Sequence, residues 1–359
     1  MNITKYVGSY HFGEGSFSRL GEEIDCRRKQ PGDYAVFMID HFFRSNPDLL
    51  DLPIRDGDIV RWVDSTDEPT TQDIDRTLAA LRKAGRHLPV ALVGIGGGCA
   101  LDNAKAVSNL LTNGGSAADY QGWDLVKVPG VFKIGVPTLS GTGAEASRTC
   151  VMMNEDKNLK LGMNSAHTVF DQLILDPQLT RTVPRDQYFY TGMDTYIHCV
   201  ESLGGSFRHA VGDAFSRESI SLCREVFLSG DMMSPANRER IMVASYLGGC
   251  AIGMSFVGVV HPLSAGLSMV LHVHHCEGNC IVMNVMDEFY PKSTAEFRRM
   301  MAAQGVSLRK GICAGLSDEQ YDQLYAASII HEKPLTNALG PNFREILTKE
   351  RVIELFKRM

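Results

Sequence analysis

Basic residues form no long run in this sequence. The longest uninterrupted basic run is Arg27-Arg28-Lys29, and the formal net charge of the 359-residue chain is −6. Proteins that bind nucleic acid need a concentrated positive field against the phosphates. Nucleic acid is therefore excluded as the main partner, and the basic triplet is interpreted as solvated surface.

A CxxC pair is also absent. The nine cysteines are odd in number and scattered, mostly in apolar contexts, which is typical of reduced thiols rather than of a disulfide framework. Cys276 and Cys280 lie four residues apart, but no second cysteine pair completes a structural zinc site. We therefore expect a cytoplasmic protein with free thiols.

Asp, Glu, Lys and Arg are missing from Ile241 to Cys276. A run of this length and hydropathy matches a membrane span. It also contains several residues that interrupt a spanning helix, namely Gly248, Gly249, Gly253, Gly258, Pro262 and Gly266. The preferred interpretation is a buried pair of helices in a soluble domain with no membrane partner, and a membrane span is the alternative.

The first half of the chain alternates short apolar runs with amphipathic ones. Strands are predicted from the apolar runs at 34–40, 58–63, 88–95 and 131–136. Helices are predicted from the apolar spacing at 71–84 and from about 98 to 111. Strands alternating with helices indicate a parallel sheet with crossover helices, which is a Rossmann-like α/β arrangement.

The second half has a different pattern. After Val183-Pro184, long helical patterns dominate and strand-like alternation nearly vanishes. We therefore predict an α/β domain at 1–182, which would bind a dinucleotide, and an all-α domain at 183–359, which would bind a metal ion.

Two turns rich in small residues support the dinucleotide prediction. The turn Gly96-Gly97-Gly98 ends a strand and opens a helix, whose free N–H groups suit a pyrophosphate. The turn Thr138–Gly143 follows the next strand and offers hydroxyls to phosphate or ribose. Asp40 ends the first strand, where an acid can accept a hydrogen bond from ribose. Each feature alone also fits an ordinary capped turn, but open α/β sheets bind ligands at these strand ends.

A carboxylate and several histidines support the metal prediction. Asp194 and His198 are four residues apart in a helical pattern, so they share one helix face, as many surface pairs do. His261 lies inside the uncharged run, where an unpaired polar group is costly. Three histidines in 272–275 end that run. One of them would complete a four-ligand shell for iron(II), zinc or manganese, and the chemistry leaves open which one.

These segments resemble the iron-dependent (group III) alcohol dehydrogenase family, within the broader group that includes glycerol dehydrogenase and dehydroquinate synthase. The resemblance is carried by GGGCALDNAK at 96–105, PTLSGTGAE at 137–145, LDPQL at 175–179 and GMDTYIHCVE at 192–201. It implies the dehydroquinate synthase-like fold and a homodimer. It also implies a divalent metal, with Fe²⁺ preferred and Zn²⁺ as the alternative, and NAD(P) as cofactor.

The resemblance implies residue roles as well. The last two histidine ligands of the family are fourteen residues apart, and His275 follows His261 by fourteen. The implied metal ligands are Asp194, His198, His261 and His275. The implied nucleotide-binding residues are Asp40, Gly97, Gly98, Asp102, Thr138, Ser140, Thr142 and Lys160.

Two positions depart from the family pattern. Ala265 stands where the family usually has the second histidine of an HxxxH pair, and Cys276 follows the fourth ligand in place of glycine. The missing histidine is often placed near the substrate and the nicotinamide. His272 or His274 is therefore predicted to carry the released proton, and a structural or surface role for both is the alternative.

Other runs resemble a narrower group, the 3-deoxy-D-manno-octulosonate 8-oxidases. These runs are 109–113, 120–123, 147–154 and 188–202. They imply oxidation of the C8 alcohol of this sugar acid (Kdo) to an aldehyde, which an aminotransferase then converts to an amine for lipopolysaccharide biosynthesis. Arg148 and Arg208 are candidates for gripping the sugar carboxylate. The alternatives are a generic NAD(P)-dependent dehydrogenase of another alcohol or polyol, and a metal-dependent lyase like dehydroquinate synthase.

Overall fold

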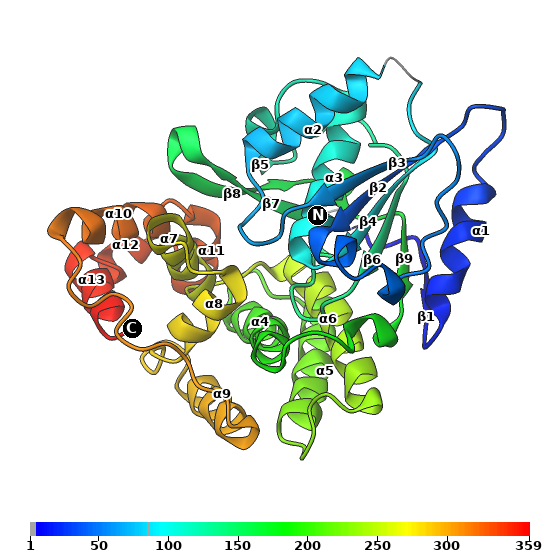
Figure 1. The fold of residues 1–359 in the computed structure, drawn as a ribbon. Coiled ribbons are helices and arrows are strands. Elements are labelled where there is room, and N and C mark those ends of the chain that lie inside the picture. Colours follow the sequence, from blue (N-terminus) through cyan, green and yellow to red (C-terminus); the bar gives the residue numbers. More distant parts are fainter. Residues whose placement is uncertain (1–4, 85–86) are drawn as a thin grey trace. The chain divides into compact units, whose positions relative to one another are not determined.

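The computed structural model describes residues 5–84 and 87–359 and divides the chain into two units. The first unit contains residues 1–139 and 144–182, and the second contains 140–143 and 183–359. Figure 1 shows strands and helices mixed in the first part of the chain and helices alone after it. The predicted fold class, a parallel-sheet α/β part followed by a helical part, is confirmed.

A six-stranded parallel sheet forms the centre of the first unit, in the order β1-β9-β6-β4-β2-β3. Its strands are β1 (Ser9–Phe12), β2 (Ala35–Asp40), β3 (Ile59–Val63), β4 (Ala91–Gly96), β6 (Lys133–Pro137) and β9 (Gln172–Leu175). Every residue of β4 and β6 is buried. Parallel strands covered on both faces carry near-continuous apolar runs, which is why these two runs are recognisable in the sequence.

Three α-helices belong to the described part of the first unit. They are α1 (Leu20–Asp25), α2 (Thr71–Lys83) and α3 (Gly98–Asn113). Helix α3 lies close against β4, because a Cβ atom added at Gly94 would come within 2.8 Å of Ala104 Cβ. A glycine in the strand therefore lets the helix approach the sheet. The N-terminus of α3 follows directly from the carboxyl end of β4.

A second, three-stranded sheet lies in the same unit, in the order β5-β8-β7. It consists of β5 (Gly122–Trp123), β7 (Thr149–Asn154) and β8 (Leu159–Asn164). Strands β7 and β8 form an antiparallel hairpin in which Met153 pairs with Lys160. Asn158 adopts a positive φ of 46° at its turn, a conformation that Asn tolerates better than most residues. These strands were not predicted from the sequence.

The second unit is built from α-helices packed around one apolar core. They are α4 (Arg185–Gly204), α5 (Ala210–Phe227), α6 (Pro235–Ser255), α7 (Val260–Leu271), α8 (His275–Met283), α9 (Pro291–Gln304), α10 (Asp318–Ile329), α11 (Glu332–Leu339), α12 (Phe343–Ile346) and α13 (Lys349–Lys357). Helix α4 is buried along most of its length, and its apolar side chains join the core with those of α7 and α8.

The uncharged run contains most of helix α6 and all of helix α7, in agreement with the expected pair of helices. They are bent by 102° at the break between Ser255 and Val260. Within the described residues, no helix taken singly has the length and hydropathy of a bilayer span, and this bent pair passes that test only when its two helices are combined.

Four residues of the predicted first domain group with the second unit instead. The segment Ser140–Gly143 leaves the first unit after Leu139. Gly141 N–H donates a hydrogen bond to Ser245 Oγ at 2.7 Å, and a Cβ atom at Gly141 would overlap the Thr191 carbonyl oxygen. The glycine lets this turn lie against α4 and α6, so the continuous domain 1–182 needs this correction.

Candidate metal and nucleotide sites

Helix α4 presents three polar side chains on one face. Asp194, His198 and Glu201 occupy positions i, i+4 and i+7, which lie above one another along a helix. All three are buried, with exposed fractions of 0%, 3% and 0%. A buried ionisable group needs a partner or a bound ion, and the partners come from two later helices.

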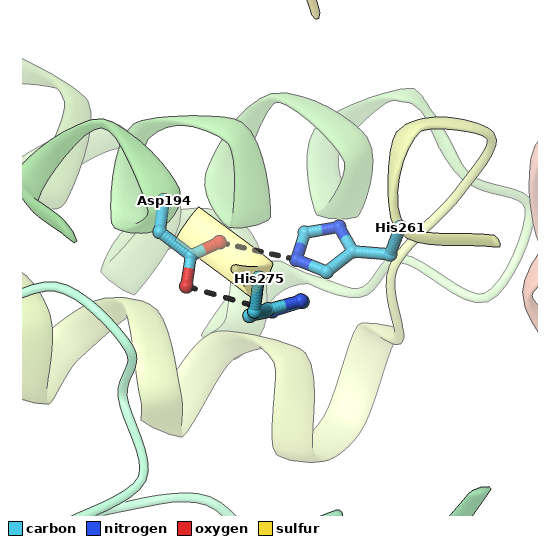
Figure 2. A group of neighbouring side chains, drawn as sticks. All are labelled: Asp194, His261 and His275. Carbon is cyan, nitrogen blue, oxygen red and sulfur yellow. Dashed lines mark ion pairs between the residues drawn. The ribbon is translucent and has the colours of Figure 1, made fainter. Parts of the chain in front are cut away.

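Histidines from α7 and α8 meet the carboxylate of Asp194 (Figure 2). His261, the second residue of α7, places Nε2 3.3 Å from Asp194 Oδ1. His275, the first residue of α8, places Nε2 3.8 Å from Asp194 Oδ2. The two imidazoles therefore approach different oxygens of the same carboxylate.

The ring of His198 completes the group. It stacks on the His261 ring with 4.5 Å between centroids and an interplanar angle of 14°, and its Nε2 lies 3.7 Å from Asp194 Oδ1. Within the described residues, its buried Nδ1 makes no hydrogen bond. The structure thus brings together all four residues of the predicted ligand set, although they come from three separate helices.

Glu201 and Asn279 hold these side chains in place, and the sequence analysis assigned no role to either. Glu201 Oε2 is hydrogen-bonded to His261 Nδ1, and its Oε1 accepts the Val260 N–H at 2.5 Å. Asn279 Nδ2 donates to Asp194 Oδ1 at 2.6 Å and lies 3.2 Å from His275 Nε2. Such partners fix the orientation and tautomer of metal ligands.

Cys276 is a third neighbour of the group. Its thiol is buried and lies 3.8 Å from Asp194 Oδ2. Both carboxylate oxygens of Asp194 therefore accept hydrogen bonds from α8. Oδ1 accepts from the Asn279 amide, and Oδ2 accepts from the Cys276 thiol. The cysteine that departs from the family pattern is thus close to the predicted ligands.

The pKa values within the group reflect burial and mutual charge. Burial opposes ionisation of Asp194, but the three histidines outweigh it and hold the pKa of Asp194 well below its usual range. Burial lowers the pKa of His198 to about 4 against the attraction of Asp194. Burial also opposes charge on His261, but the carboxylates of Glu201 and Asp194 raise its pKa to about 9.

This donor set fits a divalent metal ion. One ligand atom each from Asp194, His261 and His275 lie within 4.8 Å of one another, and His198 Nε2 borders the same carboxylate. A carboxylate with imidazoles suits iron(II) and zinc equally. The residues that would hold the ion are therefore Asp194, His198, His261 and His275.

The two predicted proton carriers lie outside this group. His272 ends α7 with a positive φ of 52°, and His274 immediately precedes α8. Both are exposed. Their proton-transfer role remains a prediction.

In the first unit, predicted nucleotide residues gather at the carboxyl ends of β2, β4 and β6. Gly97 is the N-cap of α3 and supplies no side-chain cap to the first turn of the helix, so that turn keeps N–H groups for an anion. Asp40 ends β2, and Thr138 follows β6 and donates its N–H to Gly96 O at 3.0 Å. These strand ends fit a nucleotide phosphate bound at the turn.

Three of the implied nucleotide residues have partners within the protein. Asp40 accepts hydrogen bonds from Phe42 N–H at 3.0 Å and Ser65 Oγ at 2.9 Å. Asp102 accepts the Val151 N–H at 2.9 Å and lies 3.7 Å from Lys105 Nζ. Lys160 forms an ion pair with Glu68. Asp102 is therefore a support of β7, and burial raises its pKa to about 6.

Ser140 and Thr142 belong to the second unit, as described above. Ser140 is buried, and its Oγ has no hydrogen-bond partner within the described part of the chain. The structure therefore separates the implied nucleotide residues into two sets, and nucleotide binding by Ser140 and Thr142 remains a prediction.

The two arginines predicted to grip a substrate carboxylate already pair with acids of the chain. Arg148 forms an ion pair with Asp124. Arg208 is paired with Asp213 through two of its nitrogens.

Two family models match the chain. The iron-containing alcohol dehydrogenase model matches residues 8–177, and the C-terminal model of the Fe-containing alcohol dehydrogenase family matches residues 188–333. Long-chain-alcohol dehydrogenase 1 of Geobacillus thermodenitrificans is 31% identical over 76% of this chain and 69% of its own length. Sulfoacetaldehyde reductase of Bilophila wadsworthia is 34% identical over 58% of this chain and 54% of its own length. The chain thus spans about half the length of some curated relatives that it matches.

Solved structures share the fold over almost the whole chain. A 1,3-propanediol oxidoreductase has a TM-score of 0.84 with 20% identity, covering 99% of both chains. The sulfoacetaldehyde reductase from Bifidobacterium kashiwanohense, solved with NAD⁺, has a TM-score of 0.79 with 19% identity over 99% of this chain and 98% of its own. At these identities, the likeness establishes the fold alone.

Proposed function

Because this chain belongs to the iron-containing alcohol dehydrogenase family, we propose that it oxidises a primary alcohol to an aldehyde with a divalent metal ion and NAD(P). The observation that carries this proposal is the convergence of Asp194, His198, His261 and His275 in one buried group. A divalent ion held there supplies Lewis acidity, which lowers the pKa of an alcohol hydroxyl.

The chain prepares these ligands through their neighbours. Glu201 is hydrogen-bonded to His261 Nδ1, so Nε2 is the ring nitrogen that faces Asp194 and would bind the ion once it has lost its proton. Asn279 orients the Asp194 carboxylate. Oxidation removes a hydride from the alcohol carbon and a proton from its oxygen, and a nicotinamide supplies the hydride acceptor. His272 or His274 is proposed to carry the proton away.

The proposed substrate is the C8 alcohol of 3-deoxy-D-manno-octulosonate. This choice is supported by the four sequence runs that resemble the 8-oxidases of this sugar acid. The aldehyde product would then be consumed by an aminotransferase. A generic alcohol or polyol is the alternative substrate, and oxygen is the alternative electron acceptor.

A test of this function starts with the metal content of the purified chain, measured by elemental analysis. Kdo, simple alcohols and polyols are then assayed with NAD⁺, with NADP⁺ and with oxygen alone. We expect one divalent ion per chain and aldehyde formation from Kdo. Bound metal without oxidation of any alcohol would contradict the proposed activity, and oxidation of other alcohols alone would contradict only the Kdo assignment.

A further inference from the structure

The loop between β3 and α2 is fixed at two points of the first unit. The Asp67 carbonyl oxygen accepts a hydrogen bond from Cys99 Sγ at 3.1 Å, in the first turn of α3. The Pro69 carbonyl oxygen accepts the Met153 N–H of β7 at 2.8 Å. Glu68 lies between these two anchors, so its backbone position is determined by both the helix N-terminus and the hairpin.

This anchoring brings Glu68 to Lys160. Met153 pairs with Lys160 across the hairpin. The hydrogen bond from Met153 N–H to the Pro69 carbonyl oxygen therefore places the neighbouring Glu68 beside Lys160. Glu68 Oε1 lies 3.0 Å from Lys160 Nζ, and the two side chains are only 17% and 4% exposed. An ion pair this well shielded is much less screened by salt than a surface pair.

The surroundings of the α3 N-terminus are rich in carboxylates. Burial raises the pKa of the Cys99 thiol well above its usual value, and the charges of Glu68, Asp102 and Asp40 raise it further, while Lys160 acts in the opposite direction. The contacts agree with this, because Glu68 directly follows Asp67, whose carbonyl oxygen accepts the Cys99 thiol, and Glu68 holds Lys160 at 3.0 Å. A pyrophosphate at this helix terminus would meet the same charges.

We propose that Glu68 competes with the dinucleotide phosphates for Lys160 and so determines how tightly the cofactor binds. This inference rests on the proposed use of NAD(P). The N-terminus of α3 attracts a pyrophosphate through its N–H groups, but Lys160 must exchange the Glu68 carboxylate for phosphate oxygens. Because the carboxylate and the phosphate are both strong acceptors for an ammonium group, the exchange lowers the net gain from binding.

Calorimetric titration of the full-length protein with three ligands tests this competition. NAD⁺ and ADP-ribose carry the pyrophosphate, and adenosine lacks it. We expect Glu68→Gln to bind NAD⁺ and ADP-ribose about tenfold more tightly than the wild type, which corresponds to the gain of one charge-assisted hydrogen bond. Adenosine binding should be unchanged.

Asp67→Asn provides the matched control, because it removes the same charge from an exposed neighbour. It should leave all three affinities at their wild-type values. The double variant Glu68→Gln/Lys160→Gln should lose the gain, because the released ammonium is then missing. Thermal unfolding midpoints verify that each variant is folded, and Glu68→Asp, which keeps the charge on a shorter side chain, should give an intermediate affinity.

The outcomes separate this inference from the proposed cofactor. If the wild type binds NAD⁺ and Glu68→Gln binds it no more tightly, the competition is refuted while the cofactor assignment stands. An equal gain in Asp67→Asn would also refute it, because the effect would then come from net charge. If neither the wild type nor Glu68→Gln binds NAD⁺, both the cofactor assignment and this inference are overturned.

Discussion

Polar side chains gather in both units, but they face different partners. In the second unit, Asp194 and three histidines from α4, α7 and α8 turn toward one another. In the first unit, Asp102 and Lys160 are paired with Lys105 and Glu68 of the same unit. The first arrangement brings several ligand atoms around one carboxylate, whereas the second neutralises charges within the protein.

This difference indicates which groups would bind the ligand at each site. An ion at the metal-side group would interact directly with side chains that already point at it. At the nucleotide-side turn, the charged side chains are engaged elsewhere, so the backbone N–H groups of α3 and the glycines must supply much of the attraction. The variants below test this contrast, in order of decreasing expected effect.

Removing the central carboxylate should abolish metal binding. We expect Asp194→Ala to retain less than about a tenth of the wild-type metal, since even the loss of a neighbour of a ligand weakens metal binding by about 10–100-fold. Elemental analysis after dialysis measures the effect. Asp186→Ala is the control, because Asp186 is an exposed acid in the first turn of the same helix. Full metal content in Asp194→Ala would show that the ligand set is wrong.

Asp102→Asn should reduce stability without affecting the metal. The substitution removes the carboxylate neighbour of buried Lys105. Because Lys105 Nζ still donates to the Ser147 and Thr149 carbonyl oxygens and burial already opposes charge on Asp102, we expect a loss of about 1–3 kcal/mol. Urea denaturation measures the free energy of unfolding, and elemental analysis of the same sample should give wild-type metal content. A variant as stable as the wild type would contradict the supporting role assigned to Asp102.

Glu201→Gln should weaken the metal site rather than destroy it. The substitution replaces the carboxylate that holds His261 Nδ1, and such a change lowers metal affinity by about 10–100-fold. Competition with a chelator of known affinity measures the change. Ser202→Ala is the matched control, since this buried hydroxyl of α4 contacts Ser216 instead. Equal affinities for Glu201→Gln and the wild type would remove Glu201 from the set of positioning residues.

Metal binding should release a proton from His261. Its pKa is about 9 in the metal-free protein, so at pH 8 the ring is protonated before binding and must lose that proton to become a ligand. The apparent metal affinity should therefore rise by up to about tenfold per pH unit below this pKa and level off above it. Calorimetry in buffers of different ionisation enthalpy counts the protons, and an uptake or no change at pH 8 would contradict this protonation state.

The central strands were predictable because their burial is complete. The run at 34–40 contains β2 and the run at 88–95 contains β4 except Gly96, and a strand buried on both faces carries a near-continuous apolar run. The hairpin β7–β8 escaped prediction because its six-residue strands include polar side chains and a glycine, among them Lys160 and Gly162. A short run that contains a lysine is usually interpreted as a loop, because the sequence does not show the carboxylate that pairs with the lysine.

The metal-side residues were predictable in a similar, partial way. Histidines in an uncharged run require partners, which identified His261, but the choice among the residues of 272–275 depended on the family spacing. Glu201 received no role because an acid at a helix position is usually solvated. Its position seven residues after Asp194, in a helix of low charge, was the signal that could have identified it. Glu68 gave no such signal, because its importance depends on a contact with a distant hairpin.

The placement of Asp194, His198 and Glu201 on a single helix limits how this protein can change in length. Successive residues of an α-helix are rotated by about 100°. One residue inserted between His198 and Glu201 would turn the glutamate away from His261 while leaving every ligand in the sequence. Insertions and deletions in this ten-residue stretch from Gly192 to Glu201 should therefore be absent from functional descendants of the chain.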